Sequence, residues 1–266
     1  MADQKMQSFG FDQPFSAVLV GTSGGIGSAL LEKTVARVPA SVTDSPNPGQ
    51  VFAINRKQQA YELPGVTSIT ADALVEEQLA IAVDTIKDRL KQHQLAPIRL
   101  IIVAVGALHS PQGTGPEKSL RELTAQSMQD IFAANAIAPA LAAKHFLPLL
   151  PKSGRAIFAA LSARVGSISD NQLGGWYSYR ASKAALNQIL KTASIELSRS
   201  KPDAICIGLH PGTVDTKLSK PFQGNVPDGK LFTADQSANY LIRTLSDMSA
   251  HQSGQVFAWD GSPVPA

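Results

Sequence analysis

The stretch Ser16-Ala17-Val18-Leu19-Val20-Gly21-Thr22-Ser23-Gly24-Gly25-Ile26-Gly27 decides the fold of this 266-residue chain. Its first five residues are an apolar run of the kind that forms a fully buried parallel strand. Four glycines follow within seven residues, and a helical pattern through Leu30, Leu31 and Val35 comes next. Such glycines permit a tight turn and a close approach to a pyrophosphate, whose charge the helix N-terminus accommodates. The order strand, glycine-rich turn, helix predicts a dinucleotide-binding loop, with an ordinary flexible turn as the alternative.

The same alternation of strand and helix patterns continues along the chain. Further strands are expected at 51–55, 66–70, 98–105, 155–161, 204–209 and 255–259, and helical patterns at 74–93, 123–150 and 233–250 lie between them. This order predicts an α/β fold, a doubly wound parallel sheet with helices on both faces and ligands at the carboxyl ends of its strands. One domain over 1–266 is sufficient, with a short polar extension over 1–14.

The second strand ends in Asn55-Arg56-Lys57, without a carboxylate. In a dinucleotide fold an acidic residue at this point binds the adenosine ribose hydroxyls, whereas a basic residue accommodates a 2′-phosphate. The sequence therefore favours NADP(H) over NAD(H), with two solvated surface cations as the alternative. Asp72, after the third strand, is expected to cap the next helix, to meet the adenine ring, or to do both.

Tyr179 and Lys183 lie four residues apart in a helical segment that runs to about Ser200. At that spacing both side chains share one helix face. An ammonium beside a phenol favours the phenolate, so we expect Lys183 to lower the pKa of Tyr179 and make it a proton donor or acceptor. The pair taken alone also fits an aromatic residue at a helix edge beside a solvated lysine.

Composition restricts the classes of partner. The net charge of +3 suits an anionic phosphate ligand, but there is no run of Lys or Arg and aromatic residues are only 6%, so nucleic-acid binding has little support. No apolar segment is long enough to span a membrane, and the N-terminus lacks the hydrophobic run of a signal peptide, so a cytoplasmic protein is expected. Cys206, the single cysteine, is expected to be a buried thiol rather than a nucleophile.

Two loops and two polar residues stand out further along the chain. The loops 107–118 and 217–232 are rich in Gly, Pro and polar residues and are expected to form the lips of a substrate site. Asn135 lies in an Ala-rich helical pattern, where it either bends the helix or takes part in a polar relay. His210 ends a strand and has no partner at metal or triad spacing, so we interpret it as a strand-end residue rather than a base.

In this order the motifs resemble the short-chain dehydrogenase/reductase family over nearly the whole chain. The matching residues are Gly21-x-x-x-Gly25-x-Gly27, Asp72, Asn135, Tyr179-x-x-x-Lys183 and Pro211-Gly212. The segments Gly174–Arg180 and His210–Gly212 resemble carbonyl reductase-like and cell–cell signalling factor-like members. The resemblance implies a seven-stranded Rossmann sheet and a homodimer or homotetramer assembled through long helices such as the one that carries Tyr179.

The resemblance also implies roles for these residues. Tyr179 would be the general acid in carbonyl reduction and the base in alcohol oxidation. Lys183 would lower its pKa and hold the nicotinamide ribose, and Asn135 would support a water-linked proton relay to Lys183. Thr213 and Thr216 would contact the nicotinamide carboxamide or the phosphates. The residues expected to bind the cofactor are Gly21, Ser23, Gly24, Gly25, Ile26, Gly27, Asn55, Arg56, Asp72, Gly106, Tyr179, Lys183, Pro211, Gly212, Val214 and Thr216.

Three departures from the family pattern are visible. Val20 replaces a threonine, and Val103-Ala104-Val105-Gly106 replaces Asn-Asn-Ala-Gly, which removes a hydrogen-bonding support of the sheet. The family has two adjacent serines, of which the second polarises the substrate oxygen, and here the second position is Ala163. Ser162 takes this catalytic role if the strand end is shifted by one residue, and otherwise it is a structural serine that faces away.

The leading interpretation is an NADP(H)-dependent oxidoreductase that interconverts a small-molecule carbonyl and a secondary alcohol, with Tyr179 as acid and base. The alternative is a catalytically weak NADP(H)-binding sensor or scaffold. Ala163 motivates this alternative, whereas the intact Tyr179, Lys183 and Asn135 argue against it.

Overall fold

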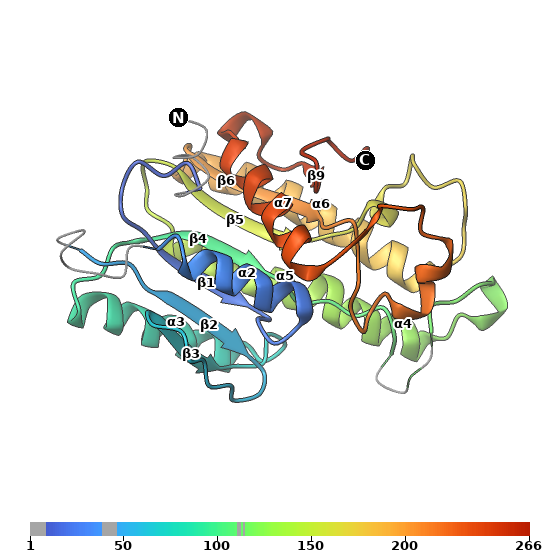
Figure 1. The fold of residues 1–266 in the computed structure, drawn as a ribbon, viewed down its shortest axis with the longest axis horizontal. Helices are drawn as coiled ribbons and strands as arrows, with labels where there is room; N and C mark the ends of the chain where they lie inside the picture. Colours follow the sequence, from blue (N-terminus) through green and yellow to red (C-terminus); the bar gives the residue numbers. More distant parts are fainter. Residues whose placement is uncertain (1–8, 39–46, 111–112, 114) are drawn as a thin grey trace.

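Seven parallel strands form the central sheet, in the order β3-β2-β1-β4-β5-β6-β9 (Figure 1). The computed structural model describes residues 9–38, 47–110, 113 and 115–266, so parts of the expected extension 1–14 and of the lip 107–118 lie outside the described residues. The predicted doubly wound α/β fold and its seven-stranded sheet are confirmed. The strands are β1 Ser16–Val20, β2 Val51–Asn55, β3 Val66–Thr70, β4 Ile98–Val103, β5 Ala156–Leu161, β6 Ala204–His210 and β9 Val256–Ala258.

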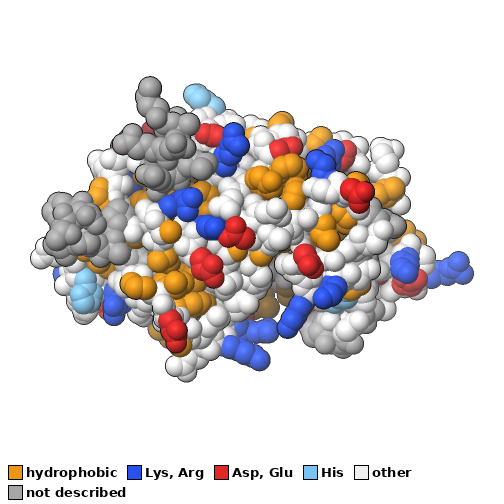
Figure 2. Space-filling model, in the orientation of Figure 1, with side chains coloured by type: hydrophobic (Ala, Val, Ile, Leu, Met, Phe, Trp, Pro, Cys, Tyr) orange, Lys and Arg blue, Asp and Glu red, His pale blue; other side chains and the backbone are white. Residues whose placement is uncertain are grey.

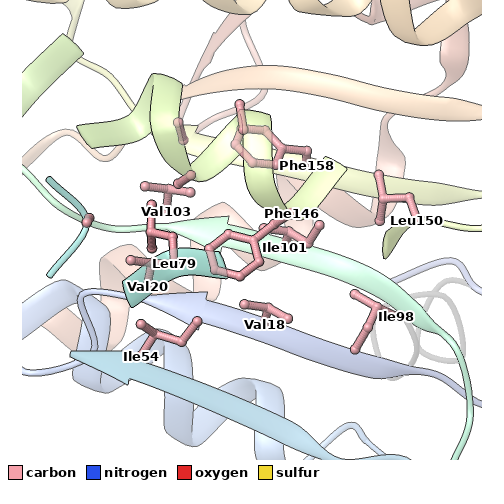
Figure 3. Close-up of a cluster of buried hydrophobic side chains, with 14 of the residues drawn as sticks. Val18, Val20, Ile54, Leu79, Ile98, Ile101, Val103, Phe146, Leu150 and Phe158 are labelled. Carbon is pink, nitrogen blue, oxygen red and sulfur yellow. The ribbon is translucent and has the colours of Figure 1, made fainter. Parts of the chain in front are cut away.

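Helices cover both faces of the sheet because both faces of its strands are apolar. Val18 and Val20 of β1 belong to one buried cluster and Ala17 and Leu19 to the other, as the two-residue period of a strand requires. Figure 3 shows the first cluster, where Phe146 packs with residues of the strands. Helices α3 Glu76–Gln92, α5 Ala138–Phe146 and α6 Tyr177–Ser200 contribute to the first cluster, and α2 Gly25–Val35 and α7 Ala234–Asp247 to the second.

The long helical pattern predicted over 123–150 is divided in the structure. Helix α4 Ala125–Phe132 continues into a π-helical turn, η2 Ala133–Ile137, before α5 begins. Pro139 stands at the start of α5, and a proline ring clashes with the carbonyl four residues earlier, which here is that of Asn135. The wider π turn relieves this clash. The helical pattern is therefore interrupted at the turn that contains Asn135, shortly before Pro139.

A pair of short strands holds the ends of the second lip. Strand β7 Thr213–Val214 pairs in parallel with β8 Leu231–Phe232, which brings together the two ends of the segment that includes the lip 217–232.

No helix among the described residues is long and apolar enough to cross a membrane. The remaining short helices are η1 Leu120–Glu122, η3 Leu147–Leu149, η4 Arg164–Gly166, η5 Lys220–Asn225 and η6 Ala250–Gln252.

Candidate active site

The glycine-rich turn joins β1 to the N-terminus of α2. A Cβ atom on Gly27 would lie 2.1 Å from the carbonyl oxygen of Gly21, so only glycine allows the helix to pack this closely on the turn. Gly24 is the N-cap of α2, and no side chain caps this helix end. Its first N–H groups therefore remain available to an anion, as a pyrophosphate-binding turn requires.

Asn55, predicted as a cofactor-binding residue, uses its buried side chain to hold this turn. Its Nδ2 donates to Thr22 Oγ1 at 2.8 Å and to Tyr61 Oη at 2.7 Å, and its Oδ1 accepts from the Ser23 N–H at 3.0 Å. The next residue, Arg56, is exposed and lines a cavity beside the turn. Asn55 therefore fixes the shape of the turn, and Arg56 is the group at this strand end that can reach a ligand.

Asp72 lines the same cavity but does not cap α3. Its Oδ1 accepts from the Leu74 N–H at 3.0 Å, in a turn that precedes the helix, and the N-cap residue is Val75. The suggestion that Asp72 caps the helix is thus wrong, because the helix begins too far from it. Its place in the cavity leaves the adenine-binding alternative open.

A continuous cleft follows the carboxyl edge of the sheet. Cavities of about 360 Å³ and about 510 Å³ share Ser23, Gly24 and the segment 104–107, and they extend from Arg56 at one end to Tyr179 and Lys183 at the other. Figure 2 shows Lys and Arg side chains around a hollow on this face of the molecule. The cleft thus combines a glycine-lined floor with cationic groups, which fits a nucleotide phosphate.

Tyr179 and Lys183 occupy one face of the first turns of α6, as their spacing predicts. Lys183 is 3% exposed, its Nζ lies 6.0 Å from the centroid of the Tyr179 ring, and it donates to the carbonyl oxygen of Leu161 at 2.8 Å. Burial lowers the pKa of Lys183 to about 8 and raises the pKa of Tyr179 to about 12. The expected lowering of the tyrosine pKa is therefore absent, because desolvation of the phenolate outweighs the attraction of the ammonium.

Asn135 joins the end of β4 to helix α6. This fully buried side chain accepts from the Ala107 N–H at 2.7 Å, and donates to the Ala107 carbonyl at 2.8 Å and to Ser182 Oγ at 3.1 Å. Ser182 Oγ in turn donates to the carbonyl of Tyr179 at 2.8 Å. A Cβ atom on Gly106 would lie 3.1 Å from Asn135 Oδ1 and 3.5 Å from Lys183 Nζ. Asn135 thus stabilises the chain just after β4, where this sequence has Val103-Ala104-Val105-Gly106 in place of the family's Asn-Asn-Ala-Gly.

Ser162 and Ala163 follow directly after β5. The hydroxyl of Ser162 donates to Asn187 Oδ1 at 2.6 Å, while Ala163 presents its methyl group to a second cavity. This second cavity, of about 210 Å³, adjoins the cleft, and we call it the pocket. Ser162 and Tyr179 line both the cleft and the pocket. The position of Ser162 suits the predicted role, although its hydroxyl is directed at Asn187.

The segment after β6 completes the wall between the two cavities. Pro211 and Thr216 line both of them, whereas Gly212, Thr213 and Val214 line only the pocket. Ser162, Tyr179 and Pro211, from distant parts of the sequence, therefore meet where the cleft adjoins the pocket, whereas Gly212 and Val214, expected to bind the cofactor, lie on the pocket side only. Among the described residues, no group of three or more His, Cys, Asp or Glu side chains is arranged to hold a metal ion.

Glu117, in the first lip, supports the start of α6 next to Tyr179, a role that the sequence did not indicate. Its buried carboxylate accepts from the Ser178 N–H at 3.2 Å, from Ser178 Oγ, and from Ser127 Oγ at 3.3 Å. Its carbonyl accepts from the Trp176 N–H at 2.5 Å. Trp176 has a left-handed backbone (φ 54°), and its ring lies 6.1 Å from that of Tyr179. Because no N-cap side chain precedes α6 locally, Glu117 provides the cap from a distance.

Comparison with known proteins agrees with this geometry. Residues 16–226 match the family profile of the short chain dehydrogenases, so the chain belongs to the short-chain dehydrogenase family, as predicted. It is 30% identical to the C-signal protein of Myxococcus xanthus over 148 residues. This match covers 55% of this chain and 83% of that protein.

Two further matches are informative. The chain is 34% identical over 128 residues to 1-hydroxy-2-glutathionyl-2-methyl-3-butene dehydrogenase of Rhodococcus sp. (strain AD45), and this match spans only about half of each protein (48% and 54%). Its fold superposes on the NADPH-bound carbonyl reductase from chicken fatty liver with a TM-score of 0.79, at 24% identity and 98% coverage of both chains. At this identity the structural similarity establishes the shared fold.

Proposed function

We propose that this protein is an NADP(H)-dependent oxidoreductase that interconverts a carbonyl compound and a secondary alcohol. One observation carries the proposal: Tyr179 lines both the cleft that starts at the glycine-rich turn and the adjoining pocket. At this position Tyr179 would lie between a nucleotide in the cleft and a small molecule in the pocket. A proton donor at that point can act on the oxygen of a group held in the pocket.

The residues around Tyr179 fit such a cofactor. The glycine-rich turn, the uncapped start of α2 and Thr216 would hold the phosphates, and Lys183 would hold the nicotinamide ribose. When bound, the nicotinamide supplies or accepts the hydride. With a pKa of about 12, Tyr179 is protonated at neutral pH and is ready to protonate the oxygen of a carbonyl that is being reduced.

Ser162 is proposed to assist Tyr179 at the substrate oxygen. Its hydroxyl lies on the wall common to cleft and pocket, and it would exchange its hydrogen bond to Asn187 for one to the substrate. Asn135 is proposed to support a water-linked relay to Lys183, since both side chains lie within 4 Å of the position of a Cβ atom on Gly106.

The preference for NADP(H) rests on the end of β2. The side chain of Asn55 is hydrogen-bonded within the glycine-rich turn, and no carboxylate follows it in the sequence. The exposed Arg56 lines the cavity where an adenosine 2′-phosphate would lie. The similar chicken carbonyl reductase has NADPH bound, which agrees with this preference.

Titration of the purified protein with NADPH and with NADH, followed by nicotinamide fluorescence, tests the proposal. We expect tighter binding of NADPH, and oxidation of the bound NADPH when a panel of aliphatic and aromatic ketones and aldehydes is added. Substituting Arg56 by alanine should weaken NADPH binding and leave NADH binding unchanged. Failure to bind either cofactor would refute the proposal.

A second candidate is an NADP(H)-binding sensor or scaffold without turnover. The observation in its favour is that Ala163 lines the pocket while the Ser162 hydroxyl is bonded to Asn187. Tight NADPH binding without turnover of any carbonyl compound would favour this function.

We also propose that the protein is a homodimer or homotetramer. The surface groove between α5 and α6 has small and apolar residues on its walls, among them Ala140, Ala143 and Ala193, together with the charged residues Lys144, Lys152, Glu196 and Lys201. The small side chains would allow a second helix pair to approach closely. Sedimentation equilibrium should give a mass of two or four chains, and Ala193→Glu should reduce it. A monomeric wild-type protein would contradict the proposal.

A further inference from the structure

The chain just before α6 has a left-handed backbone over three successive residues. The φ angles of Gly174, Gly175 and Trp176 are 65°, 64° and 54°. Glycine adopts such angles readily, whereas they cost energy for a residue with a side chain. Trp176 is also the N-cap residue of α6, where Ser, Thr, Asp and Asn are preferred, and its side chain makes no cap hydrogen bond. Neither the backbone nor the helix start accounts for a tryptophan at this position.

Hydrogen bonds from two sides hold Trp176 in this conformation. Its N–H donates to the carbonyl oxygen of the buried Glu117 at 2.5 Å. Arg180, one turn into α6, donates from Nε to the carbonyl oxygens of Gly174 at 3.3 Å and Gly175 at 3.1 Å. Backbone strain persists only where the surroundings over-determine it, and it is concentrated at active sites and ligand contacts. The side chain that this strained backbone places is therefore expected to have a role at the site.

The strained backbone places Trp176 on the wall of the pocket, beside Tyr179. Trp176 is partly exposed and lines the pocket, and its ring centroid lies 6.1 Å from that of Tyr179, with the ring planes inclined at 72°. Other apolar side chains on the wall include Leu108, Val165 and Leu218. Next to the proposed proton donor, an indole ring occupies space that a group attached to the reacting carbonyl would otherwise fill.

The space that remains in the pocket suits a single ring. The pocket has a volume of about 210 Å³. An apolar cavity of about 150 Å³ holds one benzene molecule, whereas sites for drug-sized ligands span about 300–1,000 Å³. A phenyl ring with its carbonyl group therefore fits the pocket, and two fused rings need the volume that the Trp176 side chain fills.

We propose that Trp176 determines substrate specificity by setting the size of the pocket, and that the substrate is a small, largely apolar carbonyl compound whose carbonyl carries groups no larger than one six-membered ring. This inference rests on the proposed function. Removal of the Trp176 side chain should then admit larger substrates while Tyr179 keeps its place.

Reduction of four methyl ketones by NADPH tests the role of Trp176. The ketones carry a propyl, phenyl, 2-naphthyl or 4-biphenylyl group, and kcat/KM is measured for each. In the wild type we expect kcat/KM to fall at least about 100-fold from the phenyl to the 2-naphthyl ketone. In Trp176→Gly the 2-naphthyl value divided by the propyl value should rise at least about tenfold, because glycine keeps the left-handed backbone while the ring is removed. A general loss of packing would lower all four values together and leave this ratio unchanged.

Three further variants sharpen the test. Trp176→Asn, which also tolerates a left-handed backbone, should raise the ratio as Trp176→Gly does. Trp176→Phe keeps a smaller ring on the wall and should give a smaller rise. Tyr177→Ala, which truncates an exposed aromatic neighbour outside the pocket wall, should keep the wild-type ratio.

Failure of this inference and failure of the proposed function give different results. An unchanged ratio in Trp176→Gly and Trp176→Asn would overturn the role of Trp176. So would a wild type that reduces the 2-naphthyl ketone as well as the phenyl ketone, or one that binds NADPH but reduces none of the four. Failure of the wild type to bind NADPH would refute the proposed function itself, and the role of Trp176 with it.

Discussion

Replacing Glu117 should destabilise the protein far more than a lip residue ordinarily would. Its carboxylate accepts three hydrogen bonds, two of them from Ser178 at the start of α6 and one from Ser127 of α4. A hydrogen bond to a charged group contributes about 1.5–3 kcal/mol, and loss of a helix N-cap alone costs about 1 kcal/mol. Because these contributions overlap at Ser178, we expect Glu117→Ala to lower the free energy of unfolding by about 3 kcal/mol. For a domain of this size that corresponds to about 6–12 °C in Tm.

The charge of Glu117 gives this prediction a pH dependence. Burial acts to raise the pKa of the carboxyl, but the hydrogen bonds from Ser178 and Ser127 together hold it below its ordinary value. A carboxyl with a lower pKa in the folded state contributes stability above its unfolded pKa, about 4.3, and loses that contribution as the pH falls through the folded pKa. The stability difference between wild type and Glu117→Gln should therefore be full at pH 7 and shrink below about pH 4.

Urea denaturation followed by circular dichroism measures both effects. Glu122→Ala is the matched control, because this exposed carboxylate in the same region accepts from the Lys118 N–H and should change stability by less than about 0.5 kcal/mol. A Glu117→Ala protein as stable as the wild type would refute the assignment of Glu117 as the cap of α6. So would a Glu117→Gln difference that is as large at about pH 3 as at pH 7.

Three other predictions concern the site. The rate of carbonyl reduction should fall as the pH rises through about 8, because Lys183 then loses its proton; a stopped-flow pH profile with a flat response from 7 to 9 would contradict this. Ser162→Ala should lower kcat about 10²-fold with little change in NADPH affinity, and an unchanged kcat would show that its hydroxyl stays with Asn187. Gly27→Ala should impair NADPH binding in a fluorescence titration, because a Cβ there lies 2.1 Å from the Gly21 carbonyl; unaltered binding would contradict the close packing.

The fold was predictable because its signals are local. The segments Ser16–Val20, Val51–Asn55 and Val66–Thr70 are strands with the predicted bounds. The first two are buried on both faces and therefore read as largely apolar runs, whereas Val66–Thr70 is a partly exposed edge strand that contains three Ser and Thr residues. The helical pattern over 123–150 predicted the helices but not the π turn at 133–137. The choice between a kink and a π turn depends on how the chain around Asn135 and Pro139 packs against α6, which periodicity does not contain.

The candidate site was predictable only where a motif lies within a few residues. Tyr179 and Lys183 share a helix face because of their spacing, whereas Glu117 and Ser178 meet across 61 residues of sequence. The pKa of Tyr179 was misjudged for a related reason, since burial by distant segments outweighs the neighbouring charge. His210 ends β6 as predicted, whereas its burial, which lowers its pKa, depends on segments that the local sequence does not contain.

The most direct test of the proposed chemistry is single-turnover oxidation of prebound NADPH in wild type and Tyr179→Phe. The protein is saturated with NADPH, mixed with a carbonyl compound that the wild type reduces, and followed by absorbance at the nicotinamide band in a stopped-flow instrument. We expect Tyr179→Phe to bind NADPH as the wild type does and to lose at least about 10²- to 10⁴-fold in the oxidation rate, the range for a general acid. An oxidation rate in Tyr179→Phe equal to that of the wild type would contradict the placement of Tyr179 as the proton donor.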